Sequence, residues 1–439
     1  MFAAYCSFMR FMLHKCLALL LASSLITTSC AAQVVNMPSP NIFPAADRME
    51  TYLPLLKGKR VAIFANQTSV VGPQKTHLVD TLLKAGVTIA KIFAPEHGFR
   101  GTADAGEKVG NQTDPATGLP IISLYGSKRR PSAADMADVD IMLFDLQDVG
   151  LRYYTYISAL EDYMIACFEN SKPLLVLDRP NPNGFYVDGP VLEKPFRSYV
   201  GMQPVPIVYG MTIGEYGMML AGEKWLSPLA NQQVARFEKL KPTPDTPFHF
   251  LVIKCQGYTH SSYYELPVKP SPNLPNMQSV LLYASTCYFE GTPISLGRGT
   301  NKPFQVYGHP AMPAGLPYTF TPQSVEGAKN PPLLGQKCYG VDLSTQPIDI
   351  TQPQWQRIQL KYLIDAYQAF PGKDSFFLRP SKNNPAPSDY FFNKLAGNAT
   401  LMRQLMNQVP EEAIRASWQP SIEAFKRIRK KYLLYPDFE

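Results

Sequence analysis

The sequence has few residues of the types that bind metals and no fingerprint of a nucleotide cofactor. Only six histidines and seven cysteines occur among its 439 residues, and they form neither an H-E-x-x-H nor a C-x-x-C motif. No G-x-G-x-x-G follows the first expected strand, and no G-x-x-x-x-G-K-[ST] occurs. These absences argue against a zinc site and a nucleotide site. We therefore expect neither a metal nor a cofactor.

Two motifs of serine enzymes are also absent. No G-x-S-x-G and no S-x-x-K is present, which argues against common serine hydrolases and penicillin-recognising enzymes. Charged residues make up only 18% of the chain, with a net charge of +7, and the densest basic run is residues 426–431. We interpret this run as the solvated face of the last helix, where the helix dipole favours cations, rather than as a nucleic-acid surface.

Residues 1–32 have the pattern of an export signal. Basic residues precede an apolar run over residues 16–26, which is too short to span a bilayer as a permanent helix. Small residues follow, and cleavage near Ala31 gives a soluble periplasmic protein. Cleavage before Cys30 instead gives a lipid-anchored protein of the outer membrane, although Thr27 stands where lipoprotein signals prefer leucine.

Four short apolar runs each stop at a cluster of polar residues. They span residues 60–65, 88–94, 140–144 and 173–177. Continuous apolar runs of this length are typical of strands buried on both faces, as in a parallel sheet. Helical patterns lie between them, so the alternation predicts βαβ units and an α/β fold with a mainly parallel sheet.

A change in composition divides the chain near residue 270, where prolines and then glycines become frequent. We expect residues 33–270 to form the domain with the parallel sheet, including further strands at residues 205–209 and 249–255. Residues 271–439 carry mostly helical patterns and are expected to form a smaller α/β domain.

The polar residues beyond the four runs bring chemically active side chains to one edge of the sheet, where ligands of open α/β proteins bind. They are Asn66 and Gln67 after the first run, Glu96, His97 and Arg100 after the second, Asp145, Gln147 and Asp148 after the third, and Asp178 and Arg179 after the fourth. Glu290 and Arg298, past the domain boundary, are placed to close over the same cleft. Arg298 lies between two glycines, and an arginine can grip a carboxylate bidentately.

Each of these residues also has a structural interpretation. Glu96 can hydrogen-bond the amides of its own loop, and Asp148 can cap a turn. Asp178 and Arg179 can form a local ion pair, and Arg298 can lie exposed on a glycine turn. For Glu96 we favour the functional interpretation, because a carboxylate beside an imidazole at a strand end can do general acid–base work.

Paired carboxylates without a cofactor fingerprint are typical of enzymes that catalyse hydrolysis. Among these reactions we favour glycoside hydrolysis. Two other interpretations remain open. One is a non-catalytic protein that binds cell-wall carbohydrate in the same cleft. The other is a metallohydrolase that uses Glu96, His97, Asp145 and Asp148 as ligands.

Seven segments, in order along the chain, resemble those of a bacterial family of exo-acting β-N-acetylmuramidases. They are residues 94–101 (APEHGFRG), 144–156 (FDLQDVGLRYYTY), 177–184 (LDRPNPNG), 210–215 (GMTIGE), 274–277 (LPNM), 289–292 (FEGT) and 297–304 (GRGTNKPF). A single segment is weak evidence for membership of this family, whereas the whole set in this order is specific to it. A departure occurs at residues 183–185 (NGF), where the family often has a Leu-Gly-Gly run.

The resemblance implies a Rossmann-like N-terminal domain and a smaller C-terminal domain that closes the cleft. It implies removal of N-acetylmuramic acid from the non-reducing end of peptidoglycan fragments. Glu96 matches the family's proposed catalytic glutamate. The binding partners that the resemblance implies are peptidoglycan-derived muramyl saccharides, and not nucleic acid.

We expect Glu96 to protonate the glycosidic oxygen, with His97 orienting it or setting its pKa. For the second carboxylate we place Asp148 and Asp145 ahead of Glu290, and the substrate's own N-acetyl group offers a third route. Muramic acid carries a lactyl carboxylate, so the pocket needs a cation, and the candidates are Arg100, Arg152, Arg179 and Arg298. Three rings can stack on sugar faces, although core packing is their commoner use, namely Tyr153, Tyr154 and Tyr156.

Overall fold

The computed structural model describes residues 41–96, 98–100, 110–243, 246 and 248–439. The expected signal peptide, with its candidate lipidation site at Cys30, and the candidate His97 lie outside the described residues. Four cysteines in the described part are buried free thiols, namely Cys167, Cys255, Cys287 and Cys338. Within the same part, no helix combines the length and apolar character needed to cross a membrane.

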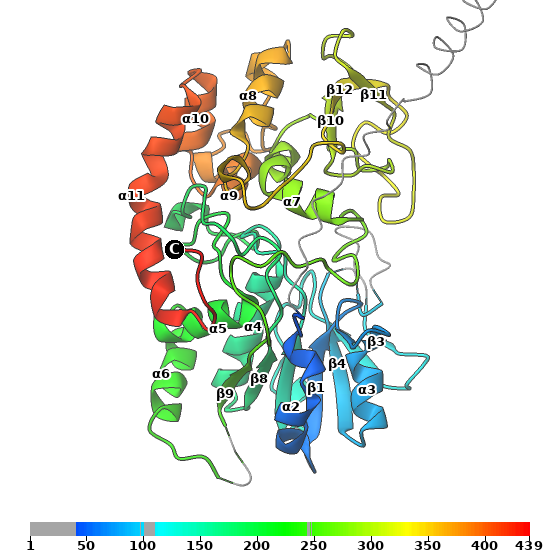
Figure 1. Cartoon of the computed structure of the whole chain (residues 1–439), viewed down its shortest axis with the longest axis vertical. Helices are drawn as coiled ribbons and strands as arrows, with labels where there is room; N and C mark the ends of the chain where they lie inside the picture. The colour runs from blue at the N-terminus through cyan, green and yellow to red at the C-terminus, as the bar shows by residue number, and fades with distance from the viewer. Residues whose placement is uncertain (1–40, 97, 101–109, 244–245, 247) are drawn as a thin grey trace, which may run out of the picture.

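A seven-stranded sheet forms the centre of the N-terminal region (Figure 1). Its strands lie in the order β5 (Gln112–Thr113), β6 (Pro120–Ser123), β4 (Thr88–Ala94), β1 (Arg60–Ala65), β7 (Ile141–Asp145), β8 (Leu174–Leu177) and β9 (Phe250–Ile253). Neighbours pair in parallel except β5, which is antiparallel to β6. The expected α/β fold with a mainly parallel sheet is confirmed.

The apolar runs form strands because helices cover both faces of the sheet. Successive side chains of a strand point to opposite faces. In β1, Val61 packs in the core shared with α2 (Met49–Leu56) and α3 (Leu78–Lys84), whereas Phe64 packs in the core shared with α4 (Tyr156–Glu169). Two further helices pack against α4, namely α5 (Ile213–Gly222) and α6 (Pro228–Phe237).

The prediction of a strand at residues 205–209 is wrong. Val208 makes only isolated bridges, to Leu151 and Asp188. Pro206 has no N–H to donate to a ladder, so this segment cannot continue as an interior strand. The segment is a buried loop that passes close to the carboxyl ends of the parallel strands instead.

The C-terminal region contains a helix α7 (Met277–Thr286), which begins at a capping box between Asn276 and Ser279. A three-stranded antiparallel sheet follows in the order β10 (Val306–His309), β12 (Cys338–Asp342) and β11 (Tyr318–Phe320). The later helices are α8 (Leu360–Ala369), α9 (Phe391–Ala396), α10 (Thr400–Met406) and α11 (Glu411–Arg429). In Figure 1 these elements lie above the seven-stranded sheet.

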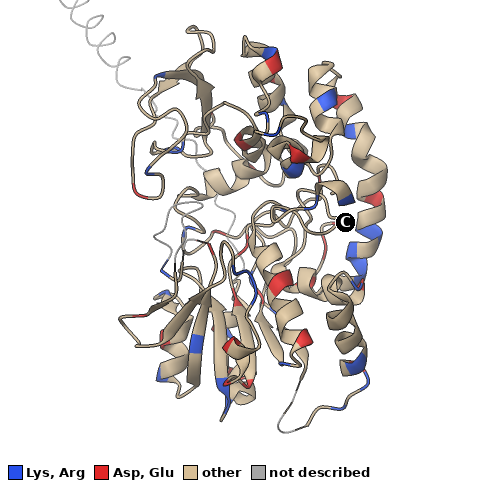
Figure 2. Ribbon diagram, turned by 180° about the vertical axis from the view of Figure 1, so that it is seen from behind, with Lys and Arg blue, Asp and Glu red and all other residues tan. Residues whose placement is uncertain are grey.

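Helix α11 runs along one side of the molecule and returns the chain to the N-terminal region (Figure 1). Lys and Arg recur along this helix (Figure 2), and the basic run lies at its C-terminal end. Arg429 is buried, pairs with Asp437 at 2.7 Å and donates to the carbonyl of Gly210 at 2.9 and 2.7 Å. Lys431 pairs with Glu223 at 2.9 Å. These pairs fasten the end of the chain to the N-terminal region.

Candidate active site

Glu96 lies in a tight turn directly after β4. The N–H of Gly98 donates to the carbonyl of Pro95 at 3.1 Å, and Gly98 has a φ of 75°, which favours glycine. The neighbouring strand β6 leads to Tyr125, whose hydroxyl donates to the Glu96 carboxylate at 2.9 Å. Burial, and then the Glu96 carboxylate, raise the pKa of Tyr125, so the phenol stays protonated and holds Glu96 in place.

Glu96 lines a cavity of about 410 Å³, hereafter the catalytic cavity. Its walls come from both regions of the chain. They include Tyr125, Arg129, Tyr153, Tyr154, Tyr156 and Tyr199 from the N-terminal region, and Asn273, Tyr283, Glu290, Arg298 and Phe304 from beyond residue 270. The cavity is therefore complete only when the two regions are packed together.

Three tyrosines at the start of α4 form one wall, and two of them are positioned by hydrogen bonds. The hydroxyl of Tyr154 donates to the carbonyl of Pro270 at 2.9 Å, and the side-chain amide of Asn66 donates to the hydroxyl of Tyr156 at 2.6 Å. The rings of Tyr154 and Tyr156 lie edge to face, with centroids 4.8 Å apart. Asn66 thus acts through Tyr156 and does not line the cavity itself.

Glu290 enters the catalytic cavity from the C-terminal region, paired with Arg298. The guanidinium donates to the carboxylate at 2.6 Å and lies 4.9 Å from the centre of the Phe304 ring. Burial acts to lower the pKa of Arg298, but the Glu290 carboxylate outweighs it and the net pKa is raised. The same pair also lines a larger cavity of about 850 Å³ within the C-terminal region, so it stands between the two cavities.

The structure places Asp145 and Arg179 in a buried ion pair. Their side chains are 0% and 1% exposed, and two hydrogen bonds of 2.6 and 2.8 Å join them. Arg179 also donates to the carbonyl of Val70 at 3.1 Å. Neither side chain lines the catalytic cavity. The pair braces the loops beyond β7 and β8, and its charges satisfy each other.

Asp148 is buried as well. It accepts from the hydroxyl of Tyr209 at 2.5 Å and from the N–H of Gly150 at 2.7 Å. Burial raises the pKa of Asp148 to about 7. Gln147 donates to the carbonyls of Asp148 and Pro180, both at 2.8 Å. These contacts shape the loop after β7, and neither side chain lines the catalytic cavity.

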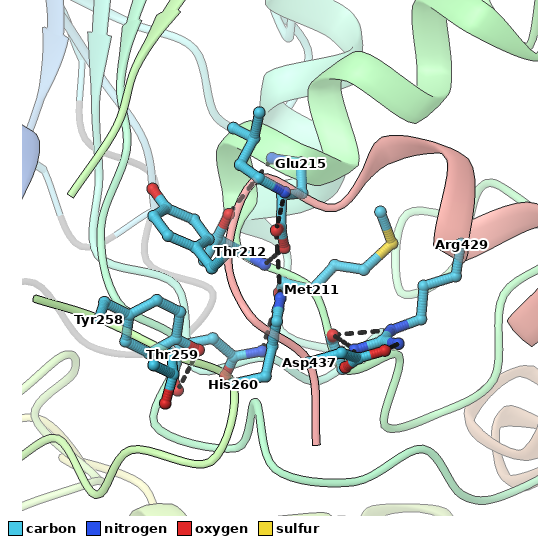
Figure 3. A network of polar contacts seen from close by, with 12 residues as sticks. Met211, Thr212, Glu215, Tyr258, Thr259, His260, Arg429 and Asp437 are labelled. Atoms are coloured by element: carbon cyan, nitrogen blue, oxygen red, sulfur yellow. Dashed lines mark hydrogen bonds and ion pairs between the residues drawn. The ribbon is translucent and has the colours of Figure 1, made fainter. Parts of the chain in front are cut away.

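Asp178 belongs to a polar network that ties the last residues of the chain to the sheet. It accepts from Thr212 at 2.7 Å and from the hydroxyl of Tyr435 at 2.6 Å. Burial and then nearby Glu215 raise the pKa of Asp178 to about 7. Figure 3 shows the adjoining part of the network, in which Glu215 lies between Thr212 and His260, 3.1 Å from the imidazole.

Three remaining candidates have partners outside the catalytic cavity. Arg152 is fully buried and donates to main-chain carbonyls, including that of Val205 at 2.8 Å. Arg100 pairs with Asp114 at 2.9 Å. Gln67 donates to the carbonyl of Pro270 at 3.1 Å. Of the four arginines expected to hold the lactyl carboxylate, the structure brings only Arg298 to the cavity.

The three described members of the metal-ligand set considered above, Glu96, Asp145 and Asp148, are not brought together. Among the described residues, no group of three or more His, Cys, Asp or Glu side chains is placed to hold a metal ion. Glu96 lines the cavity, while Asp145 and Asp148 are engaged elsewhere, and His97 lies outside the described residues.

Several residues of the cavity were missed from the sequence, among them Tyr125, Arg129 and Tyr199. Tyr125 and Arg129 follow β6, a short apolar segment that begins with Pro120 and was not recognised as a strand. Recognising residues 120–124 as a fifth buried run would have found the first two. Tyr199 lies in an irregular segment with no pattern that predicts its position.

Two glutamates and several aromatic rings around one cavity are the groups that a carbohydrate-cleaving hydrolase needs. The fold and the site therefore define a class, an α/β protein of glycoside hydrolase type. The family description "Exo-beta-N-acetylmuramidase NamZ, N-terminal" matches residues 61–278, and its C-terminal counterpart matches residues 281–435. The chain belongs to the exo-β-N-acetylmuramidase family.

Individual relatives agree with this assignment. The chain is 33% identical over 396 residues to the peptidoglycan β-N-acetylmuramidase NamZ of Bacillus subtilis (strain 168), covering 88% of this chain and 89% of that protein. A crystal structure of a DUF1343 family protein from Bacteroides fragilis NCTC 9343 is 44% identical, with a TM-score of 0.76 over 90% of this chain and 99% of that one. A second protein of that family and organism is 26% identical, with a TM-score of 0.72 over 91% and 100% of the two chains.

Proposed function

We propose that this protein is an exo-acting glycoside hydrolase that releases N-acetylmuramic acid from the non-reducing end of peptidoglycan fragments. The observation that carries the proposal is that Glu96 and Glu290, from different regions of the chain, line one cavity. Membership of the exo-β-N-acetylmuramidase family supports the choice of substrate.

In the proposed mechanism Glu96 is the general acid that protonates the glycosidic oxygen. Tyr125 holds its carboxylate by donating a hydrogen bond from the neighbouring loop. A general acid must lie within hydrogen-bond reach of the leaving oxygen, and this loop geometry aims Glu96 into the cavity. The tyrosines at the start of α4 line the cavity, and aromatic rings of this kind can pack against a sugar ring.

Glu290 is the second carboxylate in this proposal, in preference to Asp148 and Asp145. It lines the cavity, while the two aspartates are bound to Tyr209 and to Arg179. The separation of the two carboxyl groups around a bound sugar decides the stereochemistry. About 5–5.5 Å gives retention, and about 6.5–9.5 Å gives inversion.

Substituting Glu96→Gln tests the proposal. Gln cannot supply the proton, so turnover of a chromogenic N-acetylmuramic acid glycoside is expected to fall by about 10²–10⁴-fold. The matched control is Glu265→Gln at an exposed glutamate, which should retain wild-type turnover. Near wild-type turnover by Glu96→Gln contradicts the proposal. Binding of the glycoside without any release by the wild-type protein identifies a carbohydrate-binding module instead.

Export to the periplasm is part of the proposal. It is supported by the basic residues and the apolar run over residues 16–26. Mass spectrometry of the mature protein tests it and also decides between the two cleavage sites. A new N-terminus near Ala31 indicates a soluble protein, an acylated Cys30 indicates a lipid anchor, and a retained Met1 contradicts export.

A further inference from the structure

A further cavity, of about 620 Å³, adjoins the catalytic cavity. We call it the basic cavity, because four of the residues that line it are Lys128, Arg129, Arg130 and Arg197. Arg129 and Tyr199 line both cavities. The two cavities therefore adjoin at these two side chains.

Three of the four cations have their charges balanced by acidic partners. Lys128 pairs with Asp135 at 2.6 Å. The other two pairs are Arg130 with Asp162 at 2.7 Å and Arg197 with Glu161 at 2.9 Å.

Arg129 is different from these three. Its guanidinium lies 4.2 Å from the centre of the Tyr199 ring, and it forms no ion pair with any acidic residue in the described part of the chain. Among the described residues, Arg129 is thus the one cation of the basic cavity without an acidic partner, and it lies at the wall shared with the catalytic cavity.

The position of Arg129 is restrained on two sides. The residues before and after it are fixed by their ion pairs with Asp135 and Asp162. Stacking on the Tyr199 ring orients the guanidinium and leaves its N–H groups available. Arg129 also lies four residues beyond Tyr125, which binds Glu96, so one short loop carries both the contact to the general acid and this cation.

A muramic acid unit differs from a glucosamine unit by the lactyl group on its third oxygen. The lactyl carboxylate, or the carboxylates of a peptide attached to it, must be paired when water is removed from around the sugar. Arginine suits this pairing because its planar fork binds a carboxylate bidentately. Arg298, the other arginine in the catalytic cavity, already binds Glu290.

We propose that the basic cavity is a subsite for a carboxylate on the 3-O substituent of the sugar, and that Arg129 is the residue that binds it. This inference rests on the proposed function. It assigns selection of muramic acid to the loop after β6, which also holds Glu96. Arg298 is assigned a different task, which is to hold Glu290.

The test compares Arg129→Ala and Arg129→Lys with the wild-type protein on four chromogenic glycosides. They are those of N-acetylmuramic acid, of its uncharged lactyl amide, of its L-Ala-D-Glu derivative and of N-acetylglucosamine. Losing a charge-assisted pair is expected to raise KM for the acidic sugar about 10–100-fold in Arg129→Ala, with kcat nearly unchanged. KM for the two uncharged substrates should stay the same, and Arg129→Lys should recover part of the loss.

The arms of the experiment identify the source of the carboxylate. An effect on the free lactyl sugar points to the lactyl carboxylate, and an effect confined to the L-Ala-D-Glu derivative points to the peptide. Equal KM changes on charged and uncharged substrates overturn the inference. It is also overturned if Arg129→Ala discriminates between acidic and uncharged glycosides as well as the wild-type protein does. Arg427→Ala, at an exposed arginine of α11, is the matched control.

Failure of the proposed function gives a different result. If the wild-type protein releases no sugar from any substrate, the hydrolase proposal fails. Calorimetric binding of N-acetylmuramic acid and N-acetylglucosamine to the wild type and to Arg129→Ala still decides the subsite. The inference expects Arg129→Ala to lose the preference for the acidic sugar, and an unchanged preference overturns it.

Discussion

Glu290 and Asp148 carry the same chemical group in different surroundings. Glu290 lines the catalytic cavity and is held by one arginine. Asp148 is closed off from the cavity and accepts from Tyr209 and from the main chain. The first environment leaves a carboxylate available to a sugar, and the second uses the carboxyl group to shape a loop.

We predict different kinetic effects for these two residues. Glu290→Gln removes the second carboxylate, so kcat on the muramyl glycoside should fall by at least about 10²-fold. Asp148→Asn keeps the shape of the side chain and should stay within about tenfold of wild-type kcat. Steady-state kinetics at pH 6 with both purified variants makes the comparison. A larger loss in Asp148→Asn than in Glu290→Gln reverses the two assignments.

Asp148 also gives a prediction about stability and pH. Its pKa is raised from 3.8 to about 7 by burial, so the folded protein holds a proton that the unfolded chain releases. The contribution of this group to the free energy of unfolding is fully present below pH 3.8 and is lost as the pH rises through about 7.

Asn does not titrate, so Asp148→Asn should gain stability relative to the wild type between pH 5 and 7, at up to about 1.4 kcal/mol per pH unit. Urea unfolding of both proteins at several pH values measures the difference. Asp374→Asn, at an exposed carboxylate, is the control and should show no such trend. A constant difference between Asp148→Asn and wild type across this range contradicts a buried, protonated Asp148.

At the scale of secondary-structure elements, helix α5 shows how a local signal serves a distant contact. Thr212 and Glu215 form a capping box at the start of this helix. The Thr212 hydroxyl accepts from the N–H of Glu215 at 3.3 Å and donates to Asp178 at 2.7 Å. One side chain therefore ends a loop, starts a helix and holds the end of β8.

Thr212→Ala is predicted to lower the free energy of unfolding by about 1–3 kcal/mol, because the variant loses a helix cap and leaves Asp178 with one hydrogen bond fewer. Thr212→Ser keeps the hydroxyl and should lose less than half as much. Chemical denaturation of both variants measures the effect. Equal losses would attribute the effect to packing of the Thr212 methyl group and would contradict the hydrogen-bond explanation.

Elements with strong local patterns were predictable from the sequence. The strands β1 and β4 match the expected runs, because each is continuous and ends at a clear signal. The short strands β5 and β6 were missed since they have two and four residues and follow no alternation. The segment at 205–209 is apolar because it is buried, not because it pairs in a sheet.

The candidate site was predictable only in part. The carboxyl ends of the parallel strands correctly indicated the edge of the sheet at which the site lies, and they included Glu96. They could not separate residues that line the cavity from residues that hold the loops in place. Asp145 forms an ion pair with Arg179. Arg152 donates hydrogen bonds to main-chain carbonyls, including that of Leu395, 243 positions away. Such partners are set by packing between distant segments, so the sequence around each charged residue does not reveal them.

At the scale of the whole molecule, the catalytic cavity depends on two regions held in one arrangement. The regions contribute one glutamate each. The end of the chain joins them, since Tyr435 donates to Asp178 and Arg429 binds Gly210. Figure 1 shows α11 running along one side of the molecule, from beside α10 down to α5, with both attachments at its C-terminal end. The C-terminal residues thus keep the two glutamates on one cavity.

A crystal structure of Glu96→Gln with a bound muramyl disaccharide is the decisive measurement. We expect the glycosidic oxygen within hydrogen-bond distance of the residue 96 side chain, with Glu290 near the anomeric carbon of the same sugar. A disaccharide bound away from this cavity, or bound there with Glu290 turned from the sugar, would contradict the assignment of the two glutamates.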